Sequence, residues 1–327
     1  MKNEEKLRAA ALSAVRKAAV VCRGVQAKLV DASTLEKKDK SPVTVADFAS
    51  QAVVCSVLQE YFPDDGVVGE EDSEALRSDA NSGLRGEVVA QAAIGLGRGV
   101  SEGQVLDYID RGTADASAER YWTLDPIDGT KGFLRGQQYA IALALIENGE
   151  VEFGVLGCPN LELNGQAGAL FVAARGSGAA VLDLWDDSDA AGQPIHVAQL
   201  TSTKEARFCE SVESAHSDHS ESAQIAQRLG ITLEPFRIDS QCKYACVARD
   251  DASIYLRLPT RADYREKIWD HAAGKLVVEC AGGRVTDVNG LDLDFTQGRS
   301  LERNRGIVAT CGSVHDAVLA AVAAVRG

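Results

Sequence analysis

Apolar residues recur every three or four positions near the start of the chain, which is the spacing of a helix with one buried face. This stripe consists of Leu7, Ala11, Val15, Ala18, Cys22 and Val25. The spacing predicts a helix over residues 4–30. A second helix is expected to begin at Thr44, as its N-cap, and to end before Pro63.

Short apolar runs predict strands in the middle of the chain. They cover residues 66–69, 121–124, 139–147, 151–156, 169–174 and 179–184. The dipeptide Asn148-Gly149 favours a tight hairpin between the third and fourth runs, and a glycine-containing turn favours a second hairpin between the last two. The Gly- and Ala-rich segment 81–104 is expected to be mixed strand and loop.

Beyond a polar run at residues 186–194, helical and strand patterns alternate. Helices are expected at 220–229, 241–249, 270–281 and 314–325, with a short strand at 253–256. This order indicates an α/β fold in layers. The polar run predicts a boundary between two subdomains, 1–193 and 194–327.

Composition limits the classes of protein to which the chain can belong. It has 327 residues, with 34 basic and 48 acidic side chains and a formal net charge of −14. This balance argues against nucleic-acid and membrane partners, because both kinds of surface are polyanionic. No apolar stretch approaches the ~18 residues of a membrane span, and the N-terminus does not resemble a signal peptide. The eight cysteines lack CxxC spacing, so we expect reduced, mostly buried thiols and a cytoplasmic location, with an organelle left open.

The string WTLDPIDGTKGFLRG carries the most specific chemistry. Asp125 and Asp128 lie three positions apart, Pro126 restricts the backbone between them, and Gly129 allows a sharp turn. Both carboxylates and the carbonyl of Ile127 can then face one point. Hard oxygen ligands of this kind suit Mg²⁺, although a solvated turn is the alternative for the motif alone.

Three further segments contribute acidic residues. Glu70 and Glu71 occur in VVGEED, Asp47 in VTVADF and Asp270 in WDHAAG. Each has an ordinary alternative: a solvated loop for the glutamates, a capping box for Asp47, and a helix cap for Asp270. Their joint presence in this order favours a metal site. The residues from Gly129 onward predict the start of a helix whose free amides would receive a phosphate.

These ordered motifs resemble the Mg²⁺-dependent, lithium-sensitive phosphatases of the inositol monophosphatase and fructose-1,6-bisphosphatase superfamily. Within it, DPIDGTKGFLRG, SQCKYACVA, YLRLP and EKIWDHAAG are similar to the 3′(2′),5′-bisphosphate nucleotidases. These enzymes remove the 3′-phosphate of adenosine 3′,5′-bisphosphate (PAP). The resemblance runs from about residue 7 to residue 325 and weakens in 81–104. It implies an αβαβα sandwich with two subdomains.

The resemblance also implies roles for residues of the first subdomain. Glu70, Asp125 and the Ile127 carbonyl would hold one Mg²⁺, and Asp125, Asp128 and Asp270 a second, with two or three ions in all. Asp47 and Thr130 would orient and deprotonate the attacking water. Such a metal clamp stabilises both the attacking and the leaving oxygen.

Nucleotide recognition falls on the second subdomain by the same resemblance. Its implied substrate contacts are His216, Ser240, Lys243 and Arg257, together with Gly129 and Thr130 of the first subdomain. The two cations would neutralise the second phosphate, and the imidazole would contact the adenine. Surface charge is the alternative for Lys243 and Arg257. A zinc site at His216 and His219 is less favoured, because no further ligands stand nearby.

Two other functions stay open at this point. An inositol polyphosphate 1-phosphatase or inositol monophosphatase would share the metal motifs, and a non-catalytic nucleotide sensor could keep the fold. The sequence leaves open whether 3′-phosphoadenosine 5′-phosphosulfate is also a substrate, and a monomer is expected. Cys242 and Cys246 lie four apart on one helix, where a disulfide is disfavoured and two packed thiols are expected.

Overall fold

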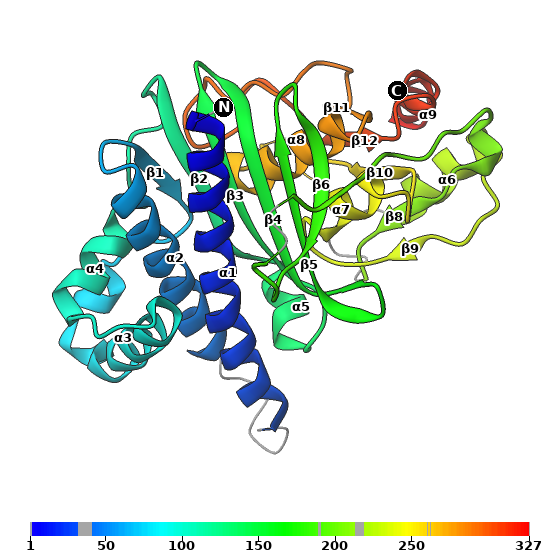
Figure 1. The fold of residues 1–327 in the computed structure, drawn as a ribbon. Helices are drawn as coiled ribbons and strands as arrows, with labels where there is room; N and C mark the ends of the chain where they lie inside the picture. The colour runs from blue at the N-terminus through cyan, green and yellow to red at the C-terminus, as the bar shows by residue number, and fades with distance from the viewer. Residues whose placement is uncertain are drawn as a thin grey trace.

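The structure, a computed structural model, describes residues 2–31, 41–188, 191–212, 219–259, 261 and 263–326. Helices and sheets alternate in five layers in this part of the chain (Figure 1). The helices are α1 (Lys2–Asp31), α2 (Ser41–Tyr61), α3 (Ser82–Leu96), α4 (Glu102–Asp110), α5 (Thr130–Leu134), α6 (His219–Leu229), α7 (Cys242–Ala248), α8 (Ala272–Cys280) and α9 (His315–Arg326).

The described strands form a seven-stranded sheet and a five-stranded sheet. The first sheet consists, in spatial order, of β1 (Gly66–Gly69), β2 (Arg120–Asp128), β3 (Ala140–Glu147), β4 (Glu150–Leu163), β5 (Gln166–Ala174), β6 (Gly178–Asp183) and β7 (Gln193–Pro194). The second has the order β11 (Arg284–Thr286), β12 (Ile307–Thr310), β10 (Ile254–Arg257), β8 (Phe208–Glu210) and β9 (Phe236–Arg237). Only β1 and β2 pair in parallel in the first sheet. The boundary predicted at residue 193 falls within β7.

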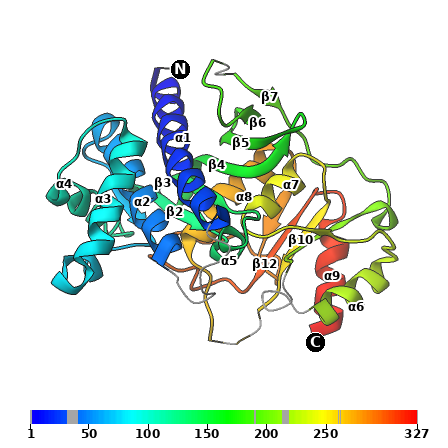
Figure 2. The same ribbon diagram turned by 90° about the horizontal axis from the view of Figure 1, so that it is seen from below.

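Both faces of the first sheet are buried, which explains why β3 is apolar without interruption. Ala142 and Ala144 face one core, which they share with α7 and α8, and Leu143 and Leu145 face the other, which they share with α1 and α2. Burying each such leucine contributes about 1.5–3 kcal/mol. The second sheet lies on the far side of α7 and α8, and α9 packs on β12 and α6 (Figure 2). The predicted αβαβα sandwich is therefore confirmed.

The predicted first and last helices and both hairpins are confirmed. The turn between β3 and β4 has positive φ at Asn148 (52°) and Gly149 (80°), as a tight hairpin of this sequence requires. The expected N-cap at Thr44 is wrong, because α2 begins three residues earlier at Ser41. Pro42 accounts for the earlier start, since its fixed φ suits the first turn of a helix.

The prediction of mixed strand and loop for residues 81–104 is wrong, because α3 and the start of α4 occupy this segment. A Cβ atom at Gly95 would lie 2.5 Å from the Val21 side chain and 2.9 Å from that of Val53. The glycine therefore lets α3 approach α1 and α2 closely. Tertiary packing outweighs the low helix propensity of this segment. A capping box between Ser101 and Gln104 starts α4.

All eight cysteines are free, and seven of them are buried. The thiols on α7 have different partners: Cys242 interacts with Cys158 on β4, and Cys246 interacts with Cys209 on β8. Each helical thiol thus contacts a neighbouring strand. Among the described residues, every helix is too short or too polar to cross a membrane.

Candidate active site

The parallel pairing of β1 and β2 brings two predicted metal ligands together. Gly69, the last residue of β1, lies opposite Leu124 in β2. The residues that follow, Glu70 and Asp125, therefore lie side by side at one edge of the sheet. Burial raises the pKa of Asp125, and the neighbouring charge of Glu70 raises it further.

Strand β2 continues through the acidic motif to Asp128, beyond the strand predicted over 121–124. The pairing of β2 with β3 shifts between Asp125 and Asp128, which places a bulge at the motif. Asp125 Oδ1 accepts a hydrogen bond of 3.1 Å from the Ile127 N–H. Asp128 Oδ2 accepts one from the backbone N–H of Gln241. The second bond joins the metal motif to the loop before α7.

Helix α2 holds the loop that follows β1 through side-chain hydrogen bonds. Asp47 is half-buried, and Gln51, one turn later, is fully buried. The Gln51 amide donates to the carbonyls of Glu71 (2.6 Å) and Ile109 (2.8 Å) and accepts from the Glu71 N–H (3.1 Å). Gln51 thus holds the loop that carries Glu70, a role that the sequence analysis missed.

Gly129 and Ser240 approach each other where the two halves of the site meet. Gly129 has φ of 92°, and a Cβ atom there would lie 2.8 Å from the Ser240 Cβ. Ser240 itself has φ of 66°. Glycine is therefore required at position 129 for its backbone conformation and for the close approach.

We expect Gly129→Ala to lower both stability and activity, because it adds backbone strain of about 1–2 kcal/mol and a steric clash. Gly165→Ala is the matched control: Gly165 has φ of 82° and no atom within 4 Å of a Cβ placed there. Thermal unfolding and phosphatase assays of both variants check this. Equal loss of activity in the two variants would contradict a local role for the contact with Ser240.

The acidic residues shift one another's pKa values. Burial raises the pKa of Asp125 well above its usual range, and the neighbouring carboxylates raise it further. Burial and then the charge of Asp270 raise the pKa of Glu70 to about 7 and that of Asp128 to about 6. Burial, followed by nearby glutamates, raises the pKa of Asp47. The structure thus collects negative charge that is costly to hold without a cation.

This donor set fits Mg²⁺. It consists of oxygen atoms, most of them from carboxylates, and lies partly out of water, where a small divalent cation would relieve the mutual repulsion. Glu70, Asp125 and Asp128 lie close enough to affect one another's pKa values.

One group of three possible metal ligands, among the described residues, brings its donor atoms within 4.8 Å of one another: Glu266, Asp270 and His271. Only Asp270 belongs to the predicted set. Glu266 Oε2 already lies 2.8 Å from Arg257 Nε and 3.1 Å from His271 Nε2. We therefore interpret this group as an internally paired network rather than a second metal site.

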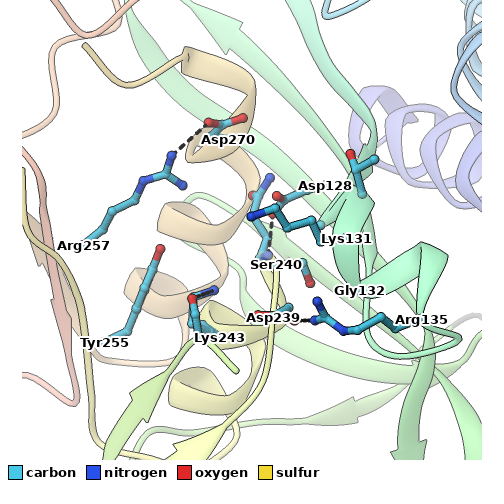
Figure 3. A pocket seen from close by; sticks show the side chains of 14 residues that line it. Asp128, Lys131, Gly132, Arg135, Asp239, Ser240, Lys243, Tyr255, Arg257 and Asp270 are labelled. Atoms are coloured by element: carbon cyan, nitrogen blue, oxygen red, sulfur yellow. Dashed lines mark hydrogen bonds and ion pairs between the residues drawn. The ribbon is translucent and has the colours of Figure 1, made fainter. Parts of the chain in front are cut away.

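A pocket of about 300 Å³ opens beside the carboxylates. Its lining consists of Asp128, Gly129, Thr130, Lys131, Gly132, Arg135, Ser211, Asp239, Ser240, Gln241, Lys243, Tyr255, Arg257 and Asp270. Figure 3 shows Arg257, Tyr255 and Lys243 along one side and Lys131, from α5, and Arg135, just after it, along the other. The pocket thus has carboxylates at one end and cations on both sides.

Lys243 is the most deeply buried of these cations, with 6% of the residue exposed. Its Nζ donates a hydrogen bond of 3.3 Å to Ser211 Oγ and lies 5.2 Å from the centre of the Tyr255 ring. Burial lowers the pKa of Lys243. An anion in the pocket would compensate this buried amine, as phosphate does at other lysines.

The predicted site residues divide into three groups. Asp128, Gly129, Thr130, Ser240, Lys243, Arg257 and Asp270 line the pocket. Asp47, Glu70, Asp125 and Ile127 are absent from its lining and belong to the adjoining carboxylate group. His216 lies outside the described residues. The roles of all of them stay predictions.

Several lining residues were not predicted. Lys131 lies in α5 and Arg135 directly follows the end of this helix. Arg135 forms an ion pair with Asp239. Tyr255 comes from β10 and Ser211 is the residue after β8. Tyr255 stands in the YLRLP motif but was given no role, and no quoted motif includes Ser211.

Comparisons with known proteins give a consistent result. Residues 3–326 match the family model described as "Inositol monophosphatase family". Proteins named 3′(2′),5′-bisphosphate nucleotidase are similar over nearly the whole chain. One from Schizosaccharomyces pombe is 44% identical and covers 96% of this chain and 94% of its own length. One from Oryza sativa is 46% identical (96% and 92%), and one from Dictyostelium discoideum is 41% identical (97% and 96%).

Solved structures support the fold alone. An inositol monophosphatase from Anabaena superposes with a TM-score of 0.64 at 20% identity and covers 98% of this chain and 97% of its own. SuhB from Mycobacterium tuberculosis superposes with a TM-score of 0.63 at 20% identity, covering 99% and 98%.

Proposed function

Because the chain belongs to the inositol monophosphatase family, we propose that it is a Mg²⁺-dependent 3′(2′),5′-bisphosphate nucleotidase that converts PAP to AMP and phosphate. The relatives at 38–46% identity carry that name, and the family generally depends on Mg²⁺. The observation that carries the proposal is the pocket, in which a carboxylate group adjoins the buried amine of Lys243 and the guanidinium of Arg257.

The carboxylate end is the place for the reacting phosphate. Glu70, Asp125, Asp128, Asp270 and the Ile127 carbonyl would hold two or three ions. When bound, Mg²⁺ supplies Lewis acidity and neutralises charge on the reacting oxygens. Residues 1–193 contribute all of these ligands except Asp270.

Asp47 and Thr130 are assigned to the attacking water. The raised pKa of Asp47, which follows from its burial and its acidic neighbours, makes this carboxylate a better proton acceptor than an exposed one. Thr130 begins α5 at the pocket wall, where its hydroxyl can orient the water. Gly129 and Thr130 also border the space for the phosphate.

The remainder of the nucleotide would contact residues 194–327. Lys243 and Arg257 neutralise the second phosphate, Ser240 hydrogen-bonds the substrate, and His216 contacts the adenine. A 5′-phosphosulfate offers similar anionic oxygens, so 3′-phosphoadenosine 5′-phosphosulfate is included as a second substrate. The acidic chain acts in the cytoplasm as a monomer on this small molecule, without nucleic-acid or membrane partners.

Neither alternative function is favoured by a specific observation. The names of the relatives point away from an inositol phosphate as the main substrate. A non-catalytic sensor should lack a ligand or the base, yet the chain retains all the predicted acids and Thr130.

The direct test is phosphate release from PAP in the presence of MgCl₂. We expect turnover that requires Mg²⁺ and exceeds that of inositol 1-phosphate by about tenfold or more, because the inositol compound lacks a group for the second anion subsite. Chelation by EDTA should stop the reaction, and renewed MgCl₂ should restore it. Turnover of inositol 1-phosphate without turnover of PAP would refute the proposal.

A further inference from the structure

Arg257, at the end of β10, contacts two carboxylates: Asp270, which also lines the pocket, and Glu266, which does not. Its Nε lies 2.8 Å from Glu266 Oε2, and its Nη2 lies 3.6 Å from Asp270 Oδ2. Figure 3 shows the guanidinium reaching from β10 toward Asp270. Because a guanidinium carries five N–H groups, these contacts leave donors for a phosphate.

A buried chain of polar side chains continues behind Glu266. His271 Nε2 lies 3.1 Å from Glu266 Oε2, and His271 Nδ1 lies 2.8 Å from the hydroxyl of Tyr244. His271 and Tyr244 are fully buried, and Glu266 is 6% exposed. None of the three lines the pocket.

Hydrogen-bonding rules give this chain a direction. An ionised carboxylate only accepts, so His271 Nε2 carries the proton that points to Glu266. In a neutral imidazole Nδ1 is then the acceptor, and the Tyr244 hydroxyl donates to it. Glu266 Oε2, both ring nitrogens of His271 and the Tyr244 hydroxyl each have a polar partner, which restricts the orientation of the three side chains.

Local packing fixes Tyr244 in this position. A Cβ atom at Gly274 would lie 2.2 Å from the Tyr244 ring, so the glycine makes room for it on α8. The ring also meets Tyr255 edge to face, with centres 5.0 Å apart. The segment that carries Asp270 thus supplies both the histidine and the space for the tyrosine that orients it.

We propose that Glu266, held by His271 and Tyr244, is a positioning residue that aims Arg257 at the second phosphate of the nucleotide and so sets the preference for substrates with two phosphates. The inference rests on the proposed function, and it assigns a role to three residues that do not touch substrate. A fixed guanidinium loses little side-chain entropy when it binds a phosphate, whereas an unsupported one must be ordered at that moment.

The test compares PAP with adenosine 3′-monophosphate, which lacks the second phosphate, at saturating MgCl₂. We expect Glu266→Gln and His271→Leu to raise the KM for PAP by about tenfold and to change kcat/KM for the monophosphate by no more than about twofold. His271→Gln keeps an amide N–H for Glu266 and should retain most of the preference. Glu279→Gln, which removes the ion-pair partner of Lys275 on α8, is the matched control and should leave the preference unchanged.

A double variant separates positioning from general damage. If Glu266 acts through Arg257, adding Glu266→Gln to Arg257→Met should lower the preference for PAP no further than Arg257→Met alone. Additive losses would contradict the inference.

The remaining outcomes distinguish the two proposals. A wild-type protein that does not hydrolyse PAP overturns both. A wild-type protein that hydrolyses PAP, combined with variants that lose thermal stability but keep the preference, overturns only the positioning role. A wild-type protein that hydrolyses PAP and adenosine 3′-monophosphate equally well also overturns only the positioning role. Should His271→Leu fail to fold, Glu266→Gln decides the question.

Discussion

Replacing Asp125 by asparagine should abolish PAP hydrolysis and, in metal-free buffer, raise the melting temperature. Asp125 is 2% exposed and lies among carboxylates that raise its pKa. Asparagine keeps an oxygen for the N–H of Ile127 but removes the charge. We expect a loss of activity of about 10³-fold or more, because the clamp on the reacting oxygens loses a central ligand.

The gain in stability follows from the same change. Without a metal, a buried negative charge beside others opposes folding, so its removal should raise the melting temperature by about 2–5 °C. MgCl₂ should stabilise the wild type, by mass action on the folded state, but hardly affect the variant. Calorimetry with and without MgCl₂, beside a phosphate-release assay, checks both parts.

Glu87→Gln is the control for Asp125→Asn. Glu87 lies exposed on α3 and belongs neither to the pocket lining nor to the acidic group, so removal of its charge should change neither activity nor the response to MgCl₂. If Asp125→Asn kept a tenth of the wild-type activity, the assignment of Asp125 as a metal ligand would be wrong.

The stability of the metal-free protein should fall as the pH rises from 6 to 8, and the stabilisation by MgCl₂ should grow over the same range. The folded pKa values of Glu70 (about 7) and Asp128 (about 6) lie above their usual values of 4.5 and 3.8. A raised folded pKa means that the folded state holds the proton more tightly. The contribution of each such carboxyl group to stability is complete below its unfolded pKa and is lost as the pH rises through its folded pKa.

Mg²⁺ reverses this trend, because it binds the deprotonated carboxylates. We expect the metal-free melting temperature to drop by about 3–6 °C between pH 6 and pH 8. The rise in melting temperature on adding millimolar MgCl₂ should be larger at pH 8 than at pH 6. Asp125→Asn should flatten the metal-free slope. A gain from MgCl₂ that is equal at both pH values would contradict the raised pKa values.

Local sequence patterns were sufficient to predict an element where its signal lies within a few neighbouring residues. The stripe on α1 and the Asn148-Gly149 turn depend on neighbours within a few positions, and both were predicted correctly. The helix over residues 82–96 was not predicted. Its glycines lower the helix propensity, and the packing of Gly95 against Val21 and Val53 is not visible in the local sequence. Intrinsic propensity does not include that contact.

The candidate site shows the same division. The acidic motifs predicted the metal residues as a set, since so many carboxylates in one order have few other uses. Tyr244, Tyr255, Glu266 and His271 stand within the quoted motifs, but the motifs carried no sign of their contacts, and Gln51 lay outside them. Gln51, Tyr255 and Tyr244 act through partners 12 or more positions away, whereas Glu266 and His271 lie five positions apart.

The sequence by itself determined the family, the layered fold and the acidic residues that would bind metal, because motifs and apolar periods are local properties of the chain. Only the tertiary structure decided how those residues are held. The parallel register of β1 and β2 places Glu70 beside Asp125, Gly129 meets Ser240, and a buried histidine orients the carboxylate behind Arg257. These relations depend on distances between segments far apart in the chain, which packing alone sets.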